Sequence, residues 1–366
     1  HLTHLTVTKS FDEFPVYLFY LKNLEYLNLS NASCKNNSFS TVFQFPSLLK
    51  HVIIKFEHLS PFMPNFDKYF RVIERLEIDY GDISENFNDL EKLFTNSTLK
   101  SLKLDFHMNY PIKYKFNSKY ECLLEEFELR GVSWEFICHL LDNLVFPRLK
   151  KITFGYLEES LDFYAVLYKL QTLTELTSLS FEEDARWLFG DERPFVFKHL
   201  LSFSWEFQDI DVIELDHLMR GMPKLEYLHF PTWNNNVLLL QHPAINIRYV
   251  YIPVSVSESK KTIWINFLKN LPNLVQLRKS VNYDLVVENE ITAGDLAYYL
   301  KILKEHFKHE MNFIIQYNCY PISLLKKDSA VLKLVRYKSK ELRAYLNEIF
   351  PLNAFELSVK RIFTFE

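Results

Sequence analysis

One short pattern recurs along most of this 366-residue chain and constrains its fold more than any other feature. The pattern is six residues long, apolar-x-x-apolar-x-apolar, and twelve copies start 22 to 27 residues apart. Its triplets are Leu2/Leu5/Val7, Leu24/Leu27/Leu29, Leu49/Val52/Ile54, Ile73/Leu76/Ile78, Leu99/Leu102/Leu104, Leu124/Phe127/Leu129, Leu149/Ile152/Phe154, Leu176/Leu179/Phe181, Leu200/Phe203/Trp205, Leu225/Leu228/Phe230, Ile247/Val250/Ile252 and, more weakly, Leu274/Leu277/Lys279. One copy arises easily by chance, but twelve at a nearly constant spacing indicate a structural repeat.

The alternation inside each hexad predicts a short strand with one buried face. Helical patterns are expected between strands at 88–94, 134–144, 163–173, 212–222 and 262–271. Proline precedes four of the hexads, where it can end a helix and turn the chain into the next strand. In the repeat after Pro46, either Leu48 or Leu49 could hold the first apolar position. A strand–helix unit of this size cannot bury its own apolar face, so the units must stack on one another.

The clearest unit is LEYLNLSNASC at 24–34, with Leu24, Leu27, Leu29, Asn31 and Cys34 in the pattern L-x-x-L-x-L-x-N-x-x-C. It resembles a leucine-rich repeat, and the resemblance covers about residues 2–280. The resemblance implies an α/β leucine-rich-repeat solenoid of about twelve repeats, with a parallel sheet on the concave face and helices on the convex face. The repeat length is similar to that of the intracellular, cysteine-containing or ribonuclease-inhibitor-like classes.

The repeat divides the chain into a solenoid at 1–280 and a different region at 281–366. The second region predicts a helix at 291–310, a strand at 311–317, one or two helices at 328–350 and a strand at 355–365. We expect it to form an α/β C-terminal cap, in which one or two degenerate repeats can be retained. A cap is also expected upstream of Leu2, because a terminal repeat otherwise exposes apolar surface.

The sequence lacks the motifs of several classes of catalytic and metal-binding site. The six glycines are scattered singly, so no loop can cradle a phosphate, and the four cysteines include no CxxC pair. We therefore expect no enzymatic activity, no cofactor and no metal site. The net charge of −4 and the pI near 6.3 predict that nucleic acid is not a partner. No apolar run reaches the about 18 residues of a membrane helix, so no membrane partner is expected.

Function is instead expected on the concave face, at the third and fifth hexad positions and the residue after the hexad, which point away from the core. The charged candidates for binding a protein partner are Arg75, Glu77, Asp79, Lys103, Asp105, Glu126, Glu128 and Arg130, and the aromatic candidates are Tyr227, His229, Tyr249 and Tyr251. Clustered tyrosines are typical of an interface hot spot, and the alternative is that the C-terminal region covers them as core. The charged residues either form a solvated face or select a charged partner.

The resemblance also suggests a function by analogy with F-box/leucine-rich-repeat proteins. On that hypothesis the chain is the substrate-recognition part of an intracellular ubiquitin-ligase adaptor, in the cytoplasm or nucleus. A missing N-terminal F-box would bind a Skp1-like subunit. The alternative is a scaffold unrelated to ubiquitin, of a GTPase-regulatory or kinetochore type.

Overall fold

The computed structural model describes residues 2–8, 20–31, 46–55, 70–81, 90–106, 118–155, 161–182, 187–188, 194–205, 212–229, 237–239, 242–252, 267–282, 312–318 and 357–362. All structural statements below concern these residues. The chain divides into two compact units, His1–Phe195 and Val196–Glu366.

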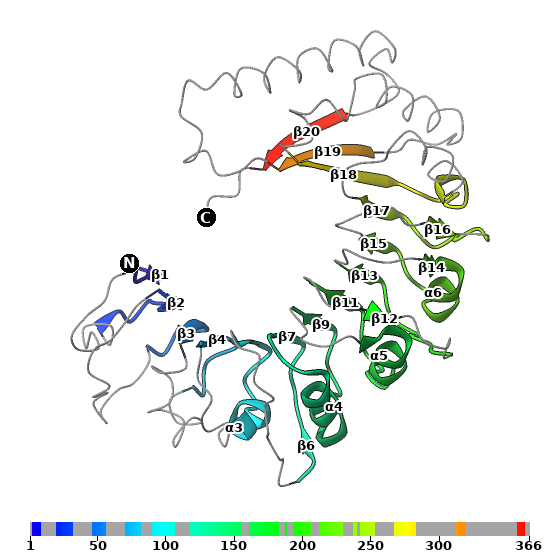
Figure 1. The fold of residues 1–366 in the computed structure, drawn as a ribbon. Helices are drawn as coiled ribbons and strands as arrows, with labels where there is room; N and C mark the ends of the chain where they lie inside the picture. The colour runs from blue at the N-terminus through cyan, green and yellow to red at the C-terminus, as the bar shows by residue number, and fades with distance from the viewer. Residues whose placement is uncertain are drawn as a thin grey trace. The chain divides into compact units, whose positions relative to one another are not determined.

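The first unit contains a parallel sheet with one strand per hexad (Figure 1). Its strands, in order of pairing, are β1 (His4–Thr6), β2 (Tyr26–Asn28), β3 (His51–Lys55), β4 (Arg75–Gly81), β5 (Ser101–Phe106), β7 (Glu126–Arg130), β9 (Lys151–Phe154) and β11 (Ser178–Phe181). The register follows the hexad, so Val52 pairs with Leu76, and Leu76 pairs with Leu102. Each repeat therefore places equivalent residues side by side.

The second unit contains strands in the same parallel arrangement. They are β13 (Ser202–Trp205), β15 (Tyr227–His229), β17 (Tyr249–Ile252), β18 (Gln276–Asn282), β19 (Asn312–Asn318) and β20 (Leu357–Ile362). β19 and β20 correspond to the strands predicted at 311–317 and 355–365, and they continue the register, since Leu277 pairs with Phe313 and Phe313 with Leu357. The helices predicted at 291–310 and 328–350 lie outside the described residues.

Short helices connect the strands and lie on one side of them (Figure 1). They are α3 (Leu90–Thr95), α4 (Trp134–Asn143) and α5 (Phe163–Leu170) in the first unit and α6 (Leu215–Gly221) in the second. Ser133 caps α4, because its hydroxyl accepts a hydrogen bond from the Phe136 N–H. Of the segment predicted as a helix at 262–271, residues 267–269 are described and helical.

The expected helix at 212–222 begins three residues late. Val212–Glu214 forms β14, which pairs with β16 (Val237–Leu239). Val212 and Ile213 are β-branched and favour a strand over the first turn of a helix. Similar two-residue pairs join β6 (Tyr120–Glu121) to β8 (Leu144–Val145) and β10 (Leu161–Asp162) to β12 (Trp187–Leu188).

The hexad residues form the core. Leu27, Leu29, Val52 and Ile54 are fully buried, and each such side chain contributes about 1.5–3 kcal/mol on burial. The structure resolves the ambiguous register after Pro46, because Leu49 is 0% exposed whereas Leu48 is 46% exposed. These repeating strands, turns and helices confirm the predicted α/β leucine-rich-repeat solenoid class.

Gly131 shows where the repeat needs a glycine. It follows β7 with a φ of 64°, and a Cβ there would lie 1.7 Å from the carbonyl oxygen of Phe106. Both the left-handed backbone and the close approach of the neighbouring repeat exclude other residues.

Candidate binding surface

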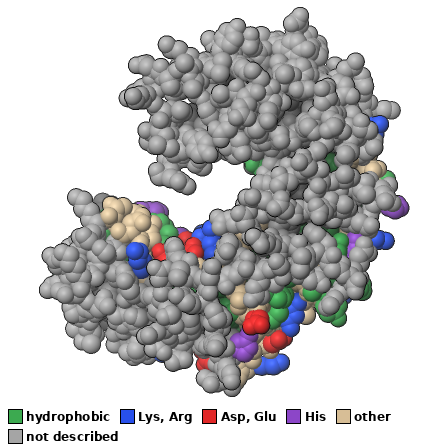
Figure 2. All heavy atoms as spheres, viewed as in Figure 1, with side chains coloured by type: hydrophobic (Ala, Val, Ile, Leu, Met, Phe, Trp, Pro, Cys, Tyr) green, Lys and Arg blue, Asp and Glu red, His purple; other side chains and the backbone are tan. Residues whose placement is uncertain are grey.

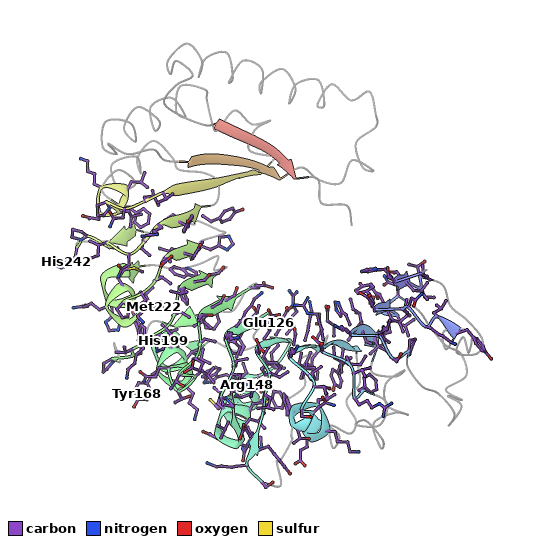
Figure 3. The ribbon with its side chains drawn as sticks, turned by 180° about the vertical axis from the view of Figure 1, so that it is seen from behind. Glu126, Arg148, Tyr168, His199, Met222 and His242 are labelled. Carbon is purple, nitrogen blue, oxygen red and sulfur yellow. The ribbon has the colours of Figure 1, made fainter. Side chains whose placement is uncertain are left out.

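The side of each sheet opposite the helices carries polar and aromatic side chains, and we call it the open face. In β3, β5 and β7, half-buried residues alternate with buried hexad residues. Figure 3 shows Glu126 on this strand side of the first unit and Tyr168 on α5, on the helix side. The outward positions predicted from the hexad are therefore confirmed for these strands.

On the open face of the first unit, charged side chains from neighbouring strands form ion pairs. Figure 2 shows acidic and basic side chains next to one another. The Glu128 carboxylate lies 2.9 Å from Lys103 Nζ and 2.8 Å from Arg130 Nε. The other end of the Arg130 guanidinium lies 2.6 Å from Glu182 Oε2. These contacts join three of the predicted site residues and add Glu182, which follows β11.

Partial burial changes the acidity of this network. Burial acts to raise the pKa of Glu128, but hydrogen bonds from Lys103 and Arg130 outweigh it and hold that pKa below its usual range. Burial acts to lower the pKa of Arg130, and its contacts with Glu128 raise it overall. Both groups therefore stay ionised at neutral pH.

A second ion pair on the same face spans β5. Arg75 Nη2 lies 2.8 Å from Glu126 Oε2, and the two residues come from β4 and β7. Ser101, on the strand between them, accepts a hydrogen bond from Arg75 Nε at 3.3 Å and donates one to Glu126 at 3.3 Å. The small serine leaves room for the two long side chains to meet above it.

The remaining charged candidates lie on β4 and β5. Glu77 Oε1 lies 2.9 Å from His51 Nε2, so this candidate is joined to the neighbouring strand β3. Asp79 and Asp105 are register partners, which places two carboxylate residues side by side on adjacent strands.

Gly155 makes the contact between Arg130 and Glu182 sterically feasible, a role that was not predicted from the sequence. A Cβ at Gly155 would lie 2.3 Å from Cγ of Arg130. The Arg130 side chain thus crosses the end of β9 in the space that a larger residue would fill. The sequence offered one signal, since the position is charged in the neighbouring repeats (Arg130 and Glu182) and glycine only here.

A column of rings on β1–β3 was also outside the predicted set. The rings of His4 and Tyr26 stack with centroids 5.5 Å apart, and Tyr26 meets His51 edge-on at 4.9 Å. All three occupy the third hexad position, so the periodic register could have placed them together.

In the second unit, the predicted aromatic residues come together in two pairs. Tyr227 and Tyr249 stack with centroids 4.3 Å apart and planes 5° apart, while His229 and Tyr251 meet edge-on at 4.1 Å. Ser204 Oγ lies 2.7 Å from His229 Nδ1 and orients that ring. Tyr227 is 44% exposed, and Tyr249 and Tyr251 are half-buried, so these tyrosines are not core residues. Partial burial, together with Tyr249, raises the pKa of Tyr227.

Charges also alternate along the turns that precede the strands of the first unit. Glu74 lies 2.9 Å from Lys100 and 3.7 Å from Lys50, and Glu125 lies 2.9 Å from Lys150. The hydrogen bond from Lys100 lowers the pKa of Glu74, and that from Lys150 lowers the pKa of Glu125. These exposed pairs join successive repeats and contribute little stability each.

Within the described residues, no three His, Cys, Asp or Glu side chains lie close enough to hold a metal ion.

Burial raises the pKa of the Cys122 thiol to about 12, which keeps it protonated and unreactive. A pocket of about 450 Å³ lies beside α6 in the second unit and is lined by Met222 and residues 242–247. Figure 3 labels Met222 and His242, two of its lining residues. No described helix is long and apolar enough to cross a bilayer.

Comparisons with known proteins add little at the level of sequence. No family model and no curated protein matches the chain, so no F-box family relationship is found. One similar solved structure is a crystal structure of a TLR13–ssRNA13 complex, with 14% identity and a TM-score of 0.46. The similarity covers 84% of this chain and 44% of that one, so the chain spans less than half of that protein's length. The repeating strands and helices define the fold class as a leucine-rich-repeat solenoid.

The expectation that nucleic acid is not a partner is corrected, because the charge argument behind it does not hold for the two units taken separately. The physical error lay in using the net charge of the whole chain. Residues 1–195 contain 21 Lys and Arg against 28 Asp and Glu, whereas residues 196–366 contain 21 against 18. A net charge of −4 hides a basic second unit, so it excludes no partner for that unit.

Proposed function

We propose that this protein is a non-enzymatic interaction scaffold that binds a polypeptide partner on the open face of its first unit. The observation that carries the proposal is the set of ion pairs that join β4, β5, β7 and Glu182, the residue after β11. These pairs order long charged side chains on a face that the described helices leave uncovered. The described residues of this face offer fixed charge positions that a partner can complement.

The network favours recognition over simple solvation. An ion pair restricts the rotamers of Arg75, Lys103 and Arg130 before a partner arrives, so less side-chain entropy is lost on binding. Mixed charge at fixed positions also rejects partners that place like charges opposite them. The expected partner is a polypeptide segment with both acidic and basic residues.

The narrower hypothesis, an intracellular F-box-type ubiquitin-ligase adaptor, rests on repeat length and on analogy alone. It predicts that the full-length gene product binds a Skp1-like subunit through a segment outside the open face. A scaffold of the GTPase-regulatory or kinetochore type predicts co-purification of a GTPase or of chromatin proteins instead.

Site-specific photo-crosslinking tests the proposed surface. A photoreactive amino acid replaces Lys151, which is exposed on β9 of the open face, or Tyr168, which is 49% exposed on α5 and serves as the control. Cells expressing each variant are irradiated, and the adducts are treated separately with nuclease and with protease before mass spectrometry. We expect a discrete protease-sensitive adduct from position 151 and none of the same mass from position 168.

A charge-matched pair of substitutions then tests the ion pairs. Glu126→Lys reverses a charge on the open face, and Glu135→Lys makes the same change on the exposed side of α4. The first substitution should abolish the position-151 adduct and the second should leave it intact. Equal adduct yields from both variants, or no protease-sensitive adduct in either, would refute the proposed surface.

A further inference from the structure

The open face of the second unit differs in chemistry from that of the first. The third and fifth hexad positions of β13, β15 and β17 are Ser202, Ser204, Tyr227, His229, Tyr249 and Tyr251. The aligned positions of β18, β19 and β20 hold Gln276, Arg278, Ser280, Asn282, Asn312, Ile314, Gln316, Asn318, Ser358, Lys360 and Ile362. None of these positions in the described strands holds an Asp or a Glu.

The two tyrosines form a stacking platform with an accessible end. One face of the Tyr227 ring lies on Tyr249, and the register neighbour on its other side is Ser202, whose side chain is small. The 44% exposure of Tyr227 is consistent with a ring that has space beside it. In the first unit, by contrast, the space above Ser101 is filled by the ion pair between Arg75 and Glu126.

A flat π-system fits beside Tyr227. A planar group inserted above Ser202 would extend the existing parallel stack, since the Tyr227 and Tyr249 planes differ by only 5°. Two residues further along the same strands, His229 and Tyr251 supply a second pair of rings, with His229 oriented by Ser204. Arg278 is the register partner of Tyr251, so a basic residue adjoins the second ring pair.

We infer that the open face of the second unit binds single-stranded nucleic acid, with one base stacked on Tyr227 above Ser202. Stacking on aromatic side chains beside basic residues is the usual means of binding single strands without strict sequence preference. In the strand register, the positions aligned with Tyr249 on β18 and β19 are Gln276 and Asn312. The open-face positions of β13, β15 and β17 hold no Asp or Glu that would repel the phosphates.

The basic residues of this unit support the same partner. The described residues from Val196 onward include nine Lys and Arg against three Asp and Glu. An acidic polypeptide would also be attracted by these charges, but it would not use the exposed ring face beside a serine. The site lies on the second unit and does not depend on the polypeptide surface proposed for the first.

Fluorescence anisotropy of the whole chain with labelled single-stranded RNA and DNA of about twelve nucleotides tests the inference. Tyr227→Ala should weaken binding about tenfold, because stacking on one aromatic ring carries that much affinity. Tyr227→Phe keeps the ring and should retain binding. Tyr168→Ala removes a tyrosine of similar exposure from α5 and should bind like the wild type.

Two further measurements separate the alternatives. Arg278→Gln should reduce the slope of log Kobs against log salt by about 0.7, the change expected for the loss of one phosphate contact. A labelled poly-glutamate peptide measures attraction to acidic polypeptides alone. The inference is overturned if neither oligonucleotide binds, if Tyr227→Ala behaves like Tyr168→Ala, or if the peptide binds with the same dependence on Tyr227. Circular dichroism of each variant establishes that the fold is retained.

Discussion

Replacing Gly155 by alanine should break the contact between Arg130 and Glu182. The new Cβ would lie 2.3 Å from Cγ of Arg130, and Cγ is too close to the backbone to move without a change of χ1. In a different rotamer the guanidinium loses its 2.6 Å contact with Glu182. Gly155 itself has no positive φ, so the substitution adds no backbone strain and acts through Arg130.

Two energetic costs set the magnitude of this effect. A hydrogen bond to a charged group contributes about 1.5–3 kcal/mol, which partial exposure of Arg130 and Glu182 reduces to about 1 kcal/mol. A side chain forced from its preferred rotamer adds about 0.5–1.5 kcal/mol. Gly155→Ala should therefore lower the free energy of unfolding by about 1.5–2.5 kcal/mol.

A double-mutant cycle tests the mechanism. Arg130→Ala removes the side chain that the new methyl group displaces, so Gly155→Ala should cost less than about 0.5 kcal/mol in that background. Urea denaturation of the wild type, both single variants and the double variant, followed by circular dichroism, gives the four stabilities. Equal cost of Gly155→Ala in both backgrounds would show that the glycine does not act through Arg130.

Three other measurements test the core, the charges and the thiol. Leu102→Ala should cost about 2–5 kcal/mol in a urea titration, because Leu102 is buried between repeats, whereas Lys151→Ala on the open face of β9 should stay within about 0.5 kcal/mol. The pKa of Glu128 is lower in the folded state than in the unfolded state. Its contribution to stability is therefore full above the usual pKa range of glutamate and is lost as the pH falls through the pKa of the folded state. In unfolding titrations, acidification should reduce the stability of Glu128→Gln less than that of the wild type. Cys122, whose pKa is raised to about 12, should resist iodoacetamide in the folded protein at a pH of about 8 and react after unfolding; rapid modification of the native protein would contradict its burial.

The hexad predicted the sheet because the same residues both define the period and fill the core. Leu102 and Leu104 alternate with the polar residues Ser101, Lys103 and Asp105. This alternation identifies the strand in the sequence and also places both leucines on its buried face. The sequence after Pro46 did not show whether Leu48 or Leu49 holds the first hexad position. The structure assigns it to Leu49, because Leu49 is buried and Leu48 is exposed. Helix boundaries were less predictable, since β-branched Val212 and Ile213 joined a strand pair that depends on residues 237–239.

The candidate surface was predictable by position but not by pairing. The hexad placed Arg75 and Glu126 on one face, yet they meet across an intervening strand, and their contact depends on the small size of Ser101. Likewise, the pairing of Arg130 with Glu182 depends on Gly155. Interactions between residues about two repeats apart reflect side-chain length and the volume of the residue between them, which a six-residue pattern does not encode.

In each repeat, the buried hexad residues stabilise the fold, whereas the residues at the open positions are available for recognition. Buried hexad positions tolerate only apolar side chains, so they hold the strands in register whatever the open positions contain. The open positions are then free to differ, and they carry ion pairs on β4, β5 and β7 and stacked rings on β15 and β17. Since the same backbone supports both, the chemistry of each face, rather than the fold, determines what each unit binds.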